Sequence, residues 1–181
     1  MSDSAESFRA WAGRWASSVA VVIAGEGDDM RAATITAFVP VSFDPPLVAI
    51  FLNRTSRMSD LLRHSERWTV SLLETEQYRL ARHFAHAARL TGSAELEQIG
   101  VVDLGEGPPA LASAAAWLSC VRENILEVGD HSMLVGSVMR HERQLEARPL
   151  LAWRGTLHRL GEVASPAHWN ALAADDLSAD F

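Results

Sequence analysis

The feature that most constrains the fold is a series of short apolar runs rich in β-branched residues, separated by Gly, Pro and Asp turns. Residues 19–24 form such a run, residues 25–29 form a turn, and residues 31–39 return with alternating threonines, which predicts a hairpin. Residues 44–46 break the chain. Residues 47–52 are then apolar at every position, as expected for a buried strand.

The rest of the chain repeats this pattern. Further strands are predicted at residues 67–73, 115–128, 131–141 and 150–160, and the middle two are joined by a tight turn at Gly129 and Asp130. Six or seven strands with few helices between them and no βαβ alternation favour an antiparallel barrel over a doubly wound sheet. We therefore predict a mainly β fold with peripheral helices.

Helical periodicity is confined to a few segments. Phe8, Trp11 and Trp15 recur at helical spacing, so we predict a helix over residues 4–17 that packs its aromatic stripe against a sheet. Further helices are predicted over residues 57–64, with Ser56 as the cap, and over residues 76–87. A last helix opens at Ser165. We expect one domain over residues 1–162 and a C-terminal helical extension over residues 163–181.

Composition excludes several kinds of chemistry. All 16 basic residues among the 181 are arginine, so the chain has no lysine for a Schiff base or a Walker P-loop. Any bound phosphate must therefore meet arginine, hydroxyl groups or backbone N–H. A net charge of −7 argues against nucleic acid or an anionic membrane as a partner. No run reaches the roughly 18 apolar residues that a spanning helix needs.

The chain has a single cysteine, Cys120, which excludes disulfide frameworks and multi-cysteine metal sites and favours the cytoplasm. Because Cys120 follows apolar residues in a predicted strand, we expect a buried side chain rather than a nucleophile. His83 and His86 share a helix, but a solvated helix face explains them better than a metal site does. We predict no metal. The chain also lacks G-x-S-x-G and G-x-G-x-x-G motifs.

Three segments carry candidate binding residues. The turn at residues 53–57 combines two arginines, two hydroxyls and a helix start, which suits a phosphate, although taken alone a surface loop with ordinary salt bridges explains this segment better. The small and hydroxyl residues at 33–37 leave a strand edge that can hydrogen-bond a planar heteroaromatic ring. His131 follows the turn at Gly129 and Asp130, where it orients a ligand or is merely a satisfied histidine.

The order of these segments resembles the flavin reductase-like family, the FMN-binding split-barrel reductases that supply reduced flavin to two-component monooxygenases. The resemblance covers most of the chain, from Phe8 to about Gly161. It rests on Phe8-Arg9, Val19-Ala-Val-Val22, Thr34-Ile-Thr-Ala-Phe38, Val41-Ser-Phe-Asp-Pro-Pro-Leu-Val48, Asn53-Arg-Thr-Ser-Arg57, Ala81-Arg-His-Phe-Ala85, Ala116-Trp-Leu-Ser-Cys120, Gly129-Asp-His131, Leu134-Val-Gly136 and Pro149-Leu-Leu-Ala-Trp-Arg-Gly155.

The resemblance implies a homodimeric split barrel of antiparallel, Greek-key-like strands. It implies hydride transfer from NADH or NADPH to N5 of FMN or FAD, so the protein holds two rings in contact and needs no nucleophile. His131 would lie near the nicotinamide. The implied flavin contacts are Thr34, Ile35, Thr36, Ala37 and Phe38 against the ring, Asn53, Arg54, Thr55, Ser56 and Arg57 at the phosphate, and His83, Phe84 and Ala85 close by.

Three residues depart from the family pattern. Ala37 and Pro40 stand where small hydroxyl residues are usual, and Met58 replaces a threonine that helps to hold the phosphate. Each lost neutral hydrogen bond costs about 0.5–1.5 kcal/mol, so flavin binding should weaken roughly ten- to a hundredfold. Weak binding suits an enzyme that uses flavin as a diffusible substrate.

The leading hypothesis is therefore an NAD(P)H-dependent flavin reductase that hands reduced FMN or FAD to a separate monooxygenase. One alternative is a flavoprotein that keeps FMN tightly bound and acts on a small organic substrate. The other is a non-catalytic split barrel that serves as a binding module. The retained Gly129-Asp130-His131 segment favours hydride transfer, while Ala37 and Met58 favour weakened flavin contact.

Overall fold

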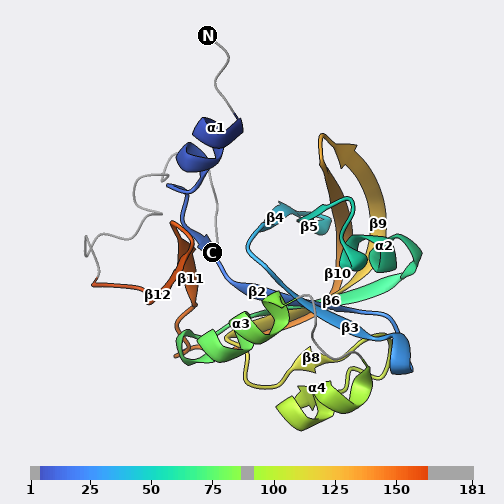
Figure 1. The fold of residues 1–181 in the computed structure, drawn as a ribbon. Coiled ribbons are helices and arrows are strands. Elements are labelled where there is room, and N and C mark those ends of the chain that lie inside the picture. Colours follow the sequence, from blue (N-terminus) through green and yellow to red (C-terminus); the bar gives the residue numbers. More distant parts are fainter. Residues whose placement is uncertain (1–4, 87–91, 163–181) are drawn as a thin grey trace.

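The computed structural model describes residues 5–86 and 92–162 (Figure 1). Helices are short and strands form the centre. The helices are α1 (Ala5–Ala12), α2 (Arg57–His64), α3 (Tyr78–Ala85), α4 (Ser93–Ile99) and the 3-10 turns η1 (Gly27–Asp29) and η2 (Thr75–Gln77). The strands are β1 (Ser17–Ser18), β2 (Ala20–Ala24), β3 (Arg31–Ile35), β4 (Phe38–Phe43), β5 (Pro46–Asn53), β6 (Arg67–Leu72), β7 (Val101–Val102), β8 (Ala110–Leu111), β9 (Ala116–Val128), β10 (His131–Arg143), β11 (Leu151–Trp153) and β12 (Thr156–His158).

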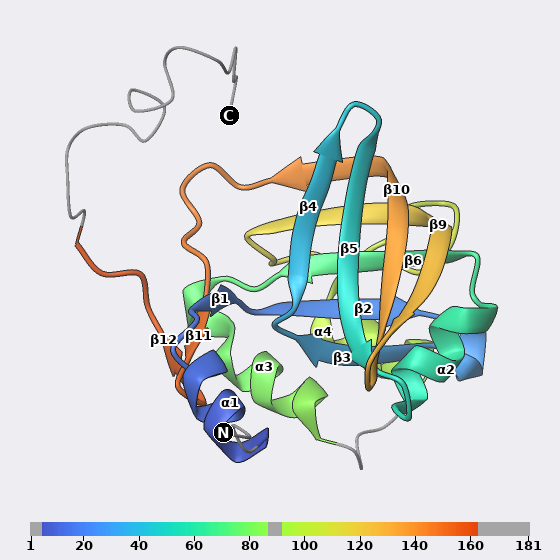
Figure 2. The same ribbon diagram turned by 90° about the horizontal axis from the view of Figure 1, so that it is seen from above.

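Seven strands form one antiparallel sheet in the order β3-β2-β6-β9-β10-β5-β4. The two edge strands, β3 and β4, are consecutive in the chain and are separated only by Thr36 and Ala37. The chain therefore passes directly from one edge of the sheet to the other, which requires the sheet to curl (Figure 2). Closure is incomplete, because among the described strands β3 pairs with β2 alone.

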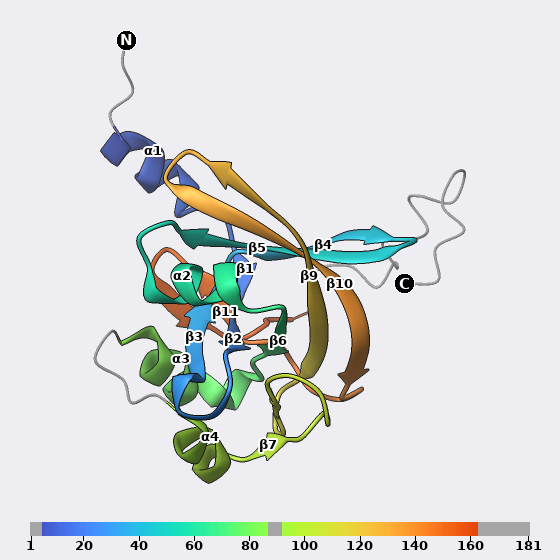
Figure 3. The ribbon, with the colours of Figure 1, turned by 90° about the vertical axis from the view of Figure 1, so that its right-hand side faces the viewer.

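Two apolar clusters lie on opposite sides of β2. Ala20, Val22 and Ala24 face the barrel interior with Trp68, while Val21 and Ile23 face outward with Phe84 of α3 and Leu96 of α4. Successive side chains in a strand point to opposite faces, so both faces of β2 are buried. This explains why residues 19–24 are apolar throughout. Figure 3 shows α3 and α4 on that outer side.

The structure breaks two predicted strands. Residues 31–39 are not one strand, because the chain leaves β3 at Thr36 and Ala37 to reach β4 on the opposite edge of the sheet. Residues 150–160 form a hairpin, β11 and β12, whose turn places Arg154 and Gly155 at positive φ. Helix α4 was not predicted. It is only seven residues long and lies between two glycines with positive φ, so its local sequence pattern is weak.

The predicted packing of the N-terminal aromatic stripe is wrong. Helix α1 ends at Ala12 rather than at Ser17, and it has no buried residue. Phe8, Trp11 and Trp15 are 64%, 66% and 77% exposed, and the Phe8 and Trp11 rings stack on each other. The spacing correctly indicated an amphipathic helix, but no described element of the chain covers its apolar side.

The predicted C-terminal helix lies outside the described residues, so the boundary at residue 162 stays a prediction. No helix among residues 5–86 and 92–162 is long and apolar enough to cross a membrane.

Helix α2 is fixed at both ends, which matters because its start contributes to the site described below. Ser56 caps the start, since its Oγ accepts a hydrogen bond from Ser59 N at 3.1 Å. Arg122 of β9 holds the other end by donating from Nη1 to the carbonyls of Leu62 at 3.2 Å and Ser65 at 3.0 Å. These bonds satisfy carbonyls that the last helical turn leaves unpaired.

Gly136 allows close packing inside the barrel. A Cβ at this position would lie 2.4 Å from Cζ2 of Trp68 and 2.8 Å from Cβ of Cys120, both of which are buried. Gly136→Ala should therefore lower the free energy of unfolding by about 1–3 kcal/mol through overpacking, measured as a shift of the urea midpoint. Gly161→Ala is the matched control, because open space surrounds that glycine. An unchanged midpoint for Gly136→Ala would contradict this account of the packing.

Candidate functional site

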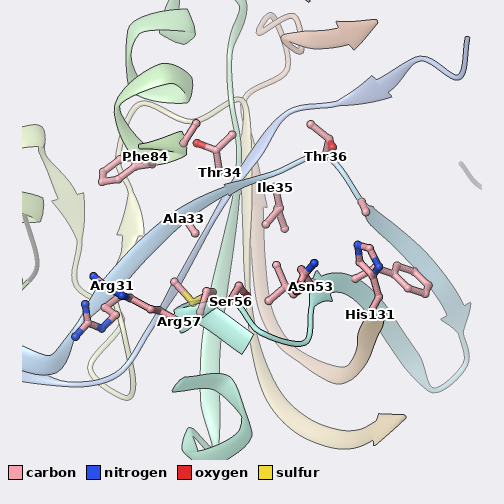
Figure 4. Close-up of a pocket in the computed structure, with 15 residues that line it drawn as sticks. Arg31, Ala33, Thr34, Ile35, Thr36, Asn53, Ser56, Arg57, Phe84 and His131 are labelled. Carbon is pink, nitrogen blue, oxygen red and sulfur yellow. The ribbon is translucent and has the colours of Figure 1, made fainter. Parts of the chain in front are cut away.

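The incomplete closure of the sheet leaves a pocket of about 550 Å³ at the seam between β3 and β5. Helix α3 and the start of α2 complete its walls (Figure 4). Ten residues predicted from the sequence line it: Thr34, Ile35, Thr36, Ala37, Asn53, Ser56, Arg57, Phe84, Ala85 and His131. The tertiary structure thus gathers residues from four separate segments of the chain around one cavity.

The crossing between β3 and β4 supplies hydrogen-bond donors to one wall. Within the described chain, neither the Thr36 nor the Ala37 backbone N–H has an acceptor, although Ala37 O accepts from Phe51 N at 3.0 Å. The Thr34 hydroxyl donates its proton to Ala81 O at 2.7 Å, so it fixes α3 and can only accept a hydrogen bond from a ligand. This wall therefore offers the backbone N–H groups of Thr36 and Ala37 as hydrogen-bond donors to the pocket.

The turn after β5 is stabilised by hydrogen bonds between its own residues. Asn53 Oδ1 accepts from the Thr55 N–H at 2.9 Å and from Thr55 Oγ1 at 2.7 Å. Thr55 is exposed and lies outside the pocket lining. Asn53 and Thr55 thus set the turn that carries Ser56 and Arg57 to the pocket.

The two arginines of this turn point to different places. Arg57 lines the pocket, whereas Arg54 Nη1 donates to Glu127 Oε2 at 3.0 Å outside it. A hydrogen bond from Arg63 and the positive charge of Arg54 hold the pKa of the Glu127 carboxyl below its usual value. Arg54 is therefore held in an ion pair with Glu127 of β9, which agrees with the alternative of a salt-bridged surface loop for this residue.

Arg31 is a lining residue that sequence reasoning missed. It lies with Arg57 at one end of the pocket, as Figure 4 shows. Within the described chain, neither guanidinium group has a side-chain hydrogen bond or an ion pair. The available signal was the two-residue period of β3, which puts Arg31 on the face of Ala33 and Ile35. The pair forms a ready site for an anion.

His131 occupies the opposite end of the pocket from the two arginines (Figure 4). Its Nδ1 lies 2.6 Å from Oδ1 of Asp130, and the hydrogen bond and charge of His131 lower the pKa of Asp130. Because an ionised carboxylate only accepts hydrogen bonds, Nδ1 carries the proton and a neutral ring leaves Nε2 as an acceptor. The residue is thus oriented to accept a hydrogen bond from a ligand.

Two other predicted residues lie outside the pocket lining. His83 Nε2 lies 2.6 Å from Glu95 Oε1 and joins α3 to α4. Phe38 lines a larger neighbouring cavity of about 940 Å³ together with Trp11 and Trp153. That cavity shares Thr36, Ala37 and Phe51 with the pocket, so the two spaces adjoin each other. Besides Arg31, the lining residues Phe51 and Leu52 were also missed, because the pattern of their strand marked them only as core. Ala33, which also lines the pocket, belongs to the predicted binding segment at residues 33–37.

The departures from the family pattern are placed differently. Met58 is buried and Ala37 is at the wall, and both line the pocket, whereas Pro40 pairs with Val48 of β5 and lies outside the lining. No group of three or more potential metal ligands occurs among the described residues. The fold and pocket thus define a β-barrel protein with a seam pocket that has backbone N–H groups along one wall and two arginines at one end.

The model of the flavin reductase like domain matches residues 12–161, and the chain belongs to this family. It is 36% identical over 156 residues to an NADH-dependent FAD reductase of Streptomyces globisporus, with 84% of each chain covered. It is 34% identical over 155 residues to the reductase component of a 4-hydroxyphenylacetate 3-monooxygenase of Thermus thermophilus, covering 86% of this chain and 96% of that one. An NADH-dependent FMN reductase of Streptomyces nodosus is 33% identical over 149 residues, covering 82% and 80%.

Solved structures agree with these relatives. The NADH:FAD oxidoreductase of Streptomyces globisporus superposes with a TM-score of 0.82 at 29% identity, covering 88% of this chain and 95% of that one. The flavin reductase component of a bacterial two-component tryptophan halogenase superposes with a TM-score of 0.81 at 28% identity, covering 87% and 99%. The predicted resemblance and the predicted fold class, a mainly β split barrel with peripheral helices, are confirmed.

Cys120 provides a test of the buried core beside the site. Burial raises the pKa of its thiol to about 12, so the unreactive thiol persists through neutral and mildly alkaline pH. We expect no labelling of the native protein by a thiol-specific disulfide reagent at about pH 8, and complete labelling in urea. Rapid labelling without denaturant would show that β9 opens or that the thiol is exposed.

Proposed function

We propose that this protein is an NADH-dependent flavin reductase that reduces freely exchanging FMN or FAD and releases it to a separate monooxygenase. The observation that carries the proposal is the seam pocket. It combines backbone donors and an arginine pair that have no partners among residues 5–86 and 92–162 with an oriented histidine. The named relatives are NADH-dependent flavin reductases or reductase components of two-component enzymes. When bound, the two cofactors supply the chemistry, as hydride passes from the nicotinamide to flavin N5.

The residues of the pocket fit the parts of a flavin. The N–H groups of Thr36 and Ala37 are unpaired in the described chain and match the carbonyl and imine acceptors of an isoalloxazine ring. Arg57 and Arg31 meet the phosphate, together with the start of α2. Because no side-chain hydroxyl stands at Ala37, flavin contact there depends on backbone, which supports weak and reversible binding.

His131 acts on the nicotinamide end. Its Nε2 is left as an acceptor by the bond to Asp130, so it holds the carboxamide N–H₂ of NADH and orients the ring over the flavin. Asp130 is a positioning residue, because it fixes the ring nitrogen that carries the proton. The neighbouring cavity that includes Trp153 gives the rest of the nicotinamide dinucleotide room.

A homodimer is proposed on the apolar surface that the single chain exposes. The stripe on α1 is largely uncovered, and Val39, Val41 and Phe43 alternate along β4 with exposures of 44%, 56% and 73%. Exposed apolar surface of this kind marks association sites. The cytoplasm is proposed as the location, because the one cysteine is unpaired and buried.

Turnover of free flavin tests the function directly. Purified protein mixed with NADH and either FMN or FAD should oxidise NADH catalytically, followed as loss of the nicotinamide absorbance band. Oxygen present in the assay reoxidises the reduced flavin, so turnover continues past one equivalent. A complete absence of NADH and NADPH oxidation with both flavins would refute the proposal.

His131→Ala should raise the KM for NADH roughly tenfold through loss of one hydrogen bond and of ring orientation, with little change in the KM for flavin. Initial rates at varied NADH and varied flavin separate the two constants. His141→Ala is the matched control, because that histidine is exposed on β10 and lies outside the pocket. Equal changes in both KM values would contradict the assigned role.

A further inference from the structure

The end of the flavin pocket that holds Arg31 and Arg57 is not closed. Both arginines also line a second cavity of about 280 Å³ on the far side, so they stand between two spaces. The other residues of this cavity are Asp29 of η1 and Asp60, Leu61 and His64 of α2. A ligand that reaches the arginines through the flavin pocket can therefore extend past them without leaving the protein surface.

The hydrogen-bonding groups and the charge of the lining residues change on passing from the flavin pocket to the second cavity. On the pocket side the guanidinium groups offer only donors and positive charge, whereas beyond them Asp29 and Asp60 offer only acceptors and negative charge. His64 adds a further acceptor, because its Nδ1 lies 2.9 Å from the Asp60 carbonyl, which leaves Nε2 of the neutral ring free to accept. In the described chain, neither aspartate side chain has a hydrogen bond or an ion pair.

FMN and FAD would present different groups to these acceptors: FMN a negatively charged phosphate, and FAD neutral hydrogen-bond donors. FMN ends in a phosphate monoester with a charge near −2, which at the arginine pair would be repelled by the two carboxylates that line the adjoining cavity. FAD continues as a pyrophosphate, with about one negative charge on each phosphate for two arginines to meet. It then presents ribose hydroxyls and an adenine amino group, which are donors for carboxylates.

We propose that the site prefers FAD over FMN, and that the adenosine half of FAD binds in the cavity beyond Arg31 and Arg57. This inference rests on the proposed function for the placement of the flavin ring. It is independent of the relatives, which include both FAD and FMN reductases. Asp29, Asp60 and His64 are then the residues that determine flavin specificity.

Binding of oxidised flavin, measured by isothermal titration calorimetry without NADH, tests the preference. The native protein should bind FAD about tenfold more tightly than FMN, the gain expected from a few additional hydrogen bonds to charged groups. Equal dissociation constants for the two flavins would overturn the inference, and this measurement needs no variant.

The double variant Asp29→Ala and Asp60→Ala distinguishes hydrogen bonds from FAD to these carboxylates from a simple repulsion of flavin phosphates by their charge. Removal of the carboxylates should weaken FAD binding several-fold and tighten FMN binding, so the preference is lost. A purely electrostatic role would tighten both flavins alike and leave their ratio unchanged, which would overturn the inference. Glu97→Ala with Glu142→Ala is the matched control, because it removes the same charge from exposed positions outside both cavities.

The two proposals fail in different ways. NADH oxidation with both flavins but no FAD preference would refute only the adenosine site. Selective FAD binding without NADH oxidation would refute the reductase function and support the adenosine site. Failure to bind any flavin would refute both.

Discussion

The site depends on one topological constraint, the passage of the chain from one edge of the main sheet to the other within two residues. Thr36 and Ala37 connect β3 to β4, so the sheet has to curl, yet β3 does not pair with β5 among the described strands. An unpaired edge of a sheet leaves backbone donors and acceptors unsatisfied. Here that edge faces a pocket instead of a neighbouring strand. Its unpaired backbone groups are therefore available to hydrogen-bond a ligand.

Electrostatics divide the same pocket along its length. Arg31 and Arg57 have no ion-pair partner in the described chain, while Arg54 and Arg63 are held by Glu127. The chain thus places two guanidinium groups at the pocket and ties two others to the outside of the barrel. With no lysine in the sequence, this division decides where a phosphate can bind. His131, oriented by Asp130, lies at the opposite end, so the two ends of the pocket differ in the groups that they offer a ligand.

Sequence patterns predicted the parts of the site that have local signals. The Asn53 turn, the Ser56 cap and the histidine after Gly129 each follow from residue types at fixed spacing. Ser56 caps α2 as predicted, and Asn53 and His131 line the seam pocket, while the ligand contacts assigned to these residues stay predictions. Arg31 was missed, because the two-residue period of β3 places it on the face of Ala33 and Ile35 but does not show whether that face lines a pocket or meets solvent. The aromatic stripe of α1 was wrongly predicted to pack against a sheet. Periodicity shows that a helix has an apolar face, but it does not show what covers that face.

The sequence by itself determined the mainly β class, the family resemblance and the restriction of any phosphate contact to arginine, hydroxyl groups and backbone N–H. It did so because strand periodicity, turn residues and composition are local properties of the chain. Only the tertiary structure decided which arginines reach the pocket, and that a second cavity with acceptor groups lies beyond them. The physical reason is that curling of the sheet brings β3, β5 and α2 together, and no local pattern records how residues so far apart in sequence face one another.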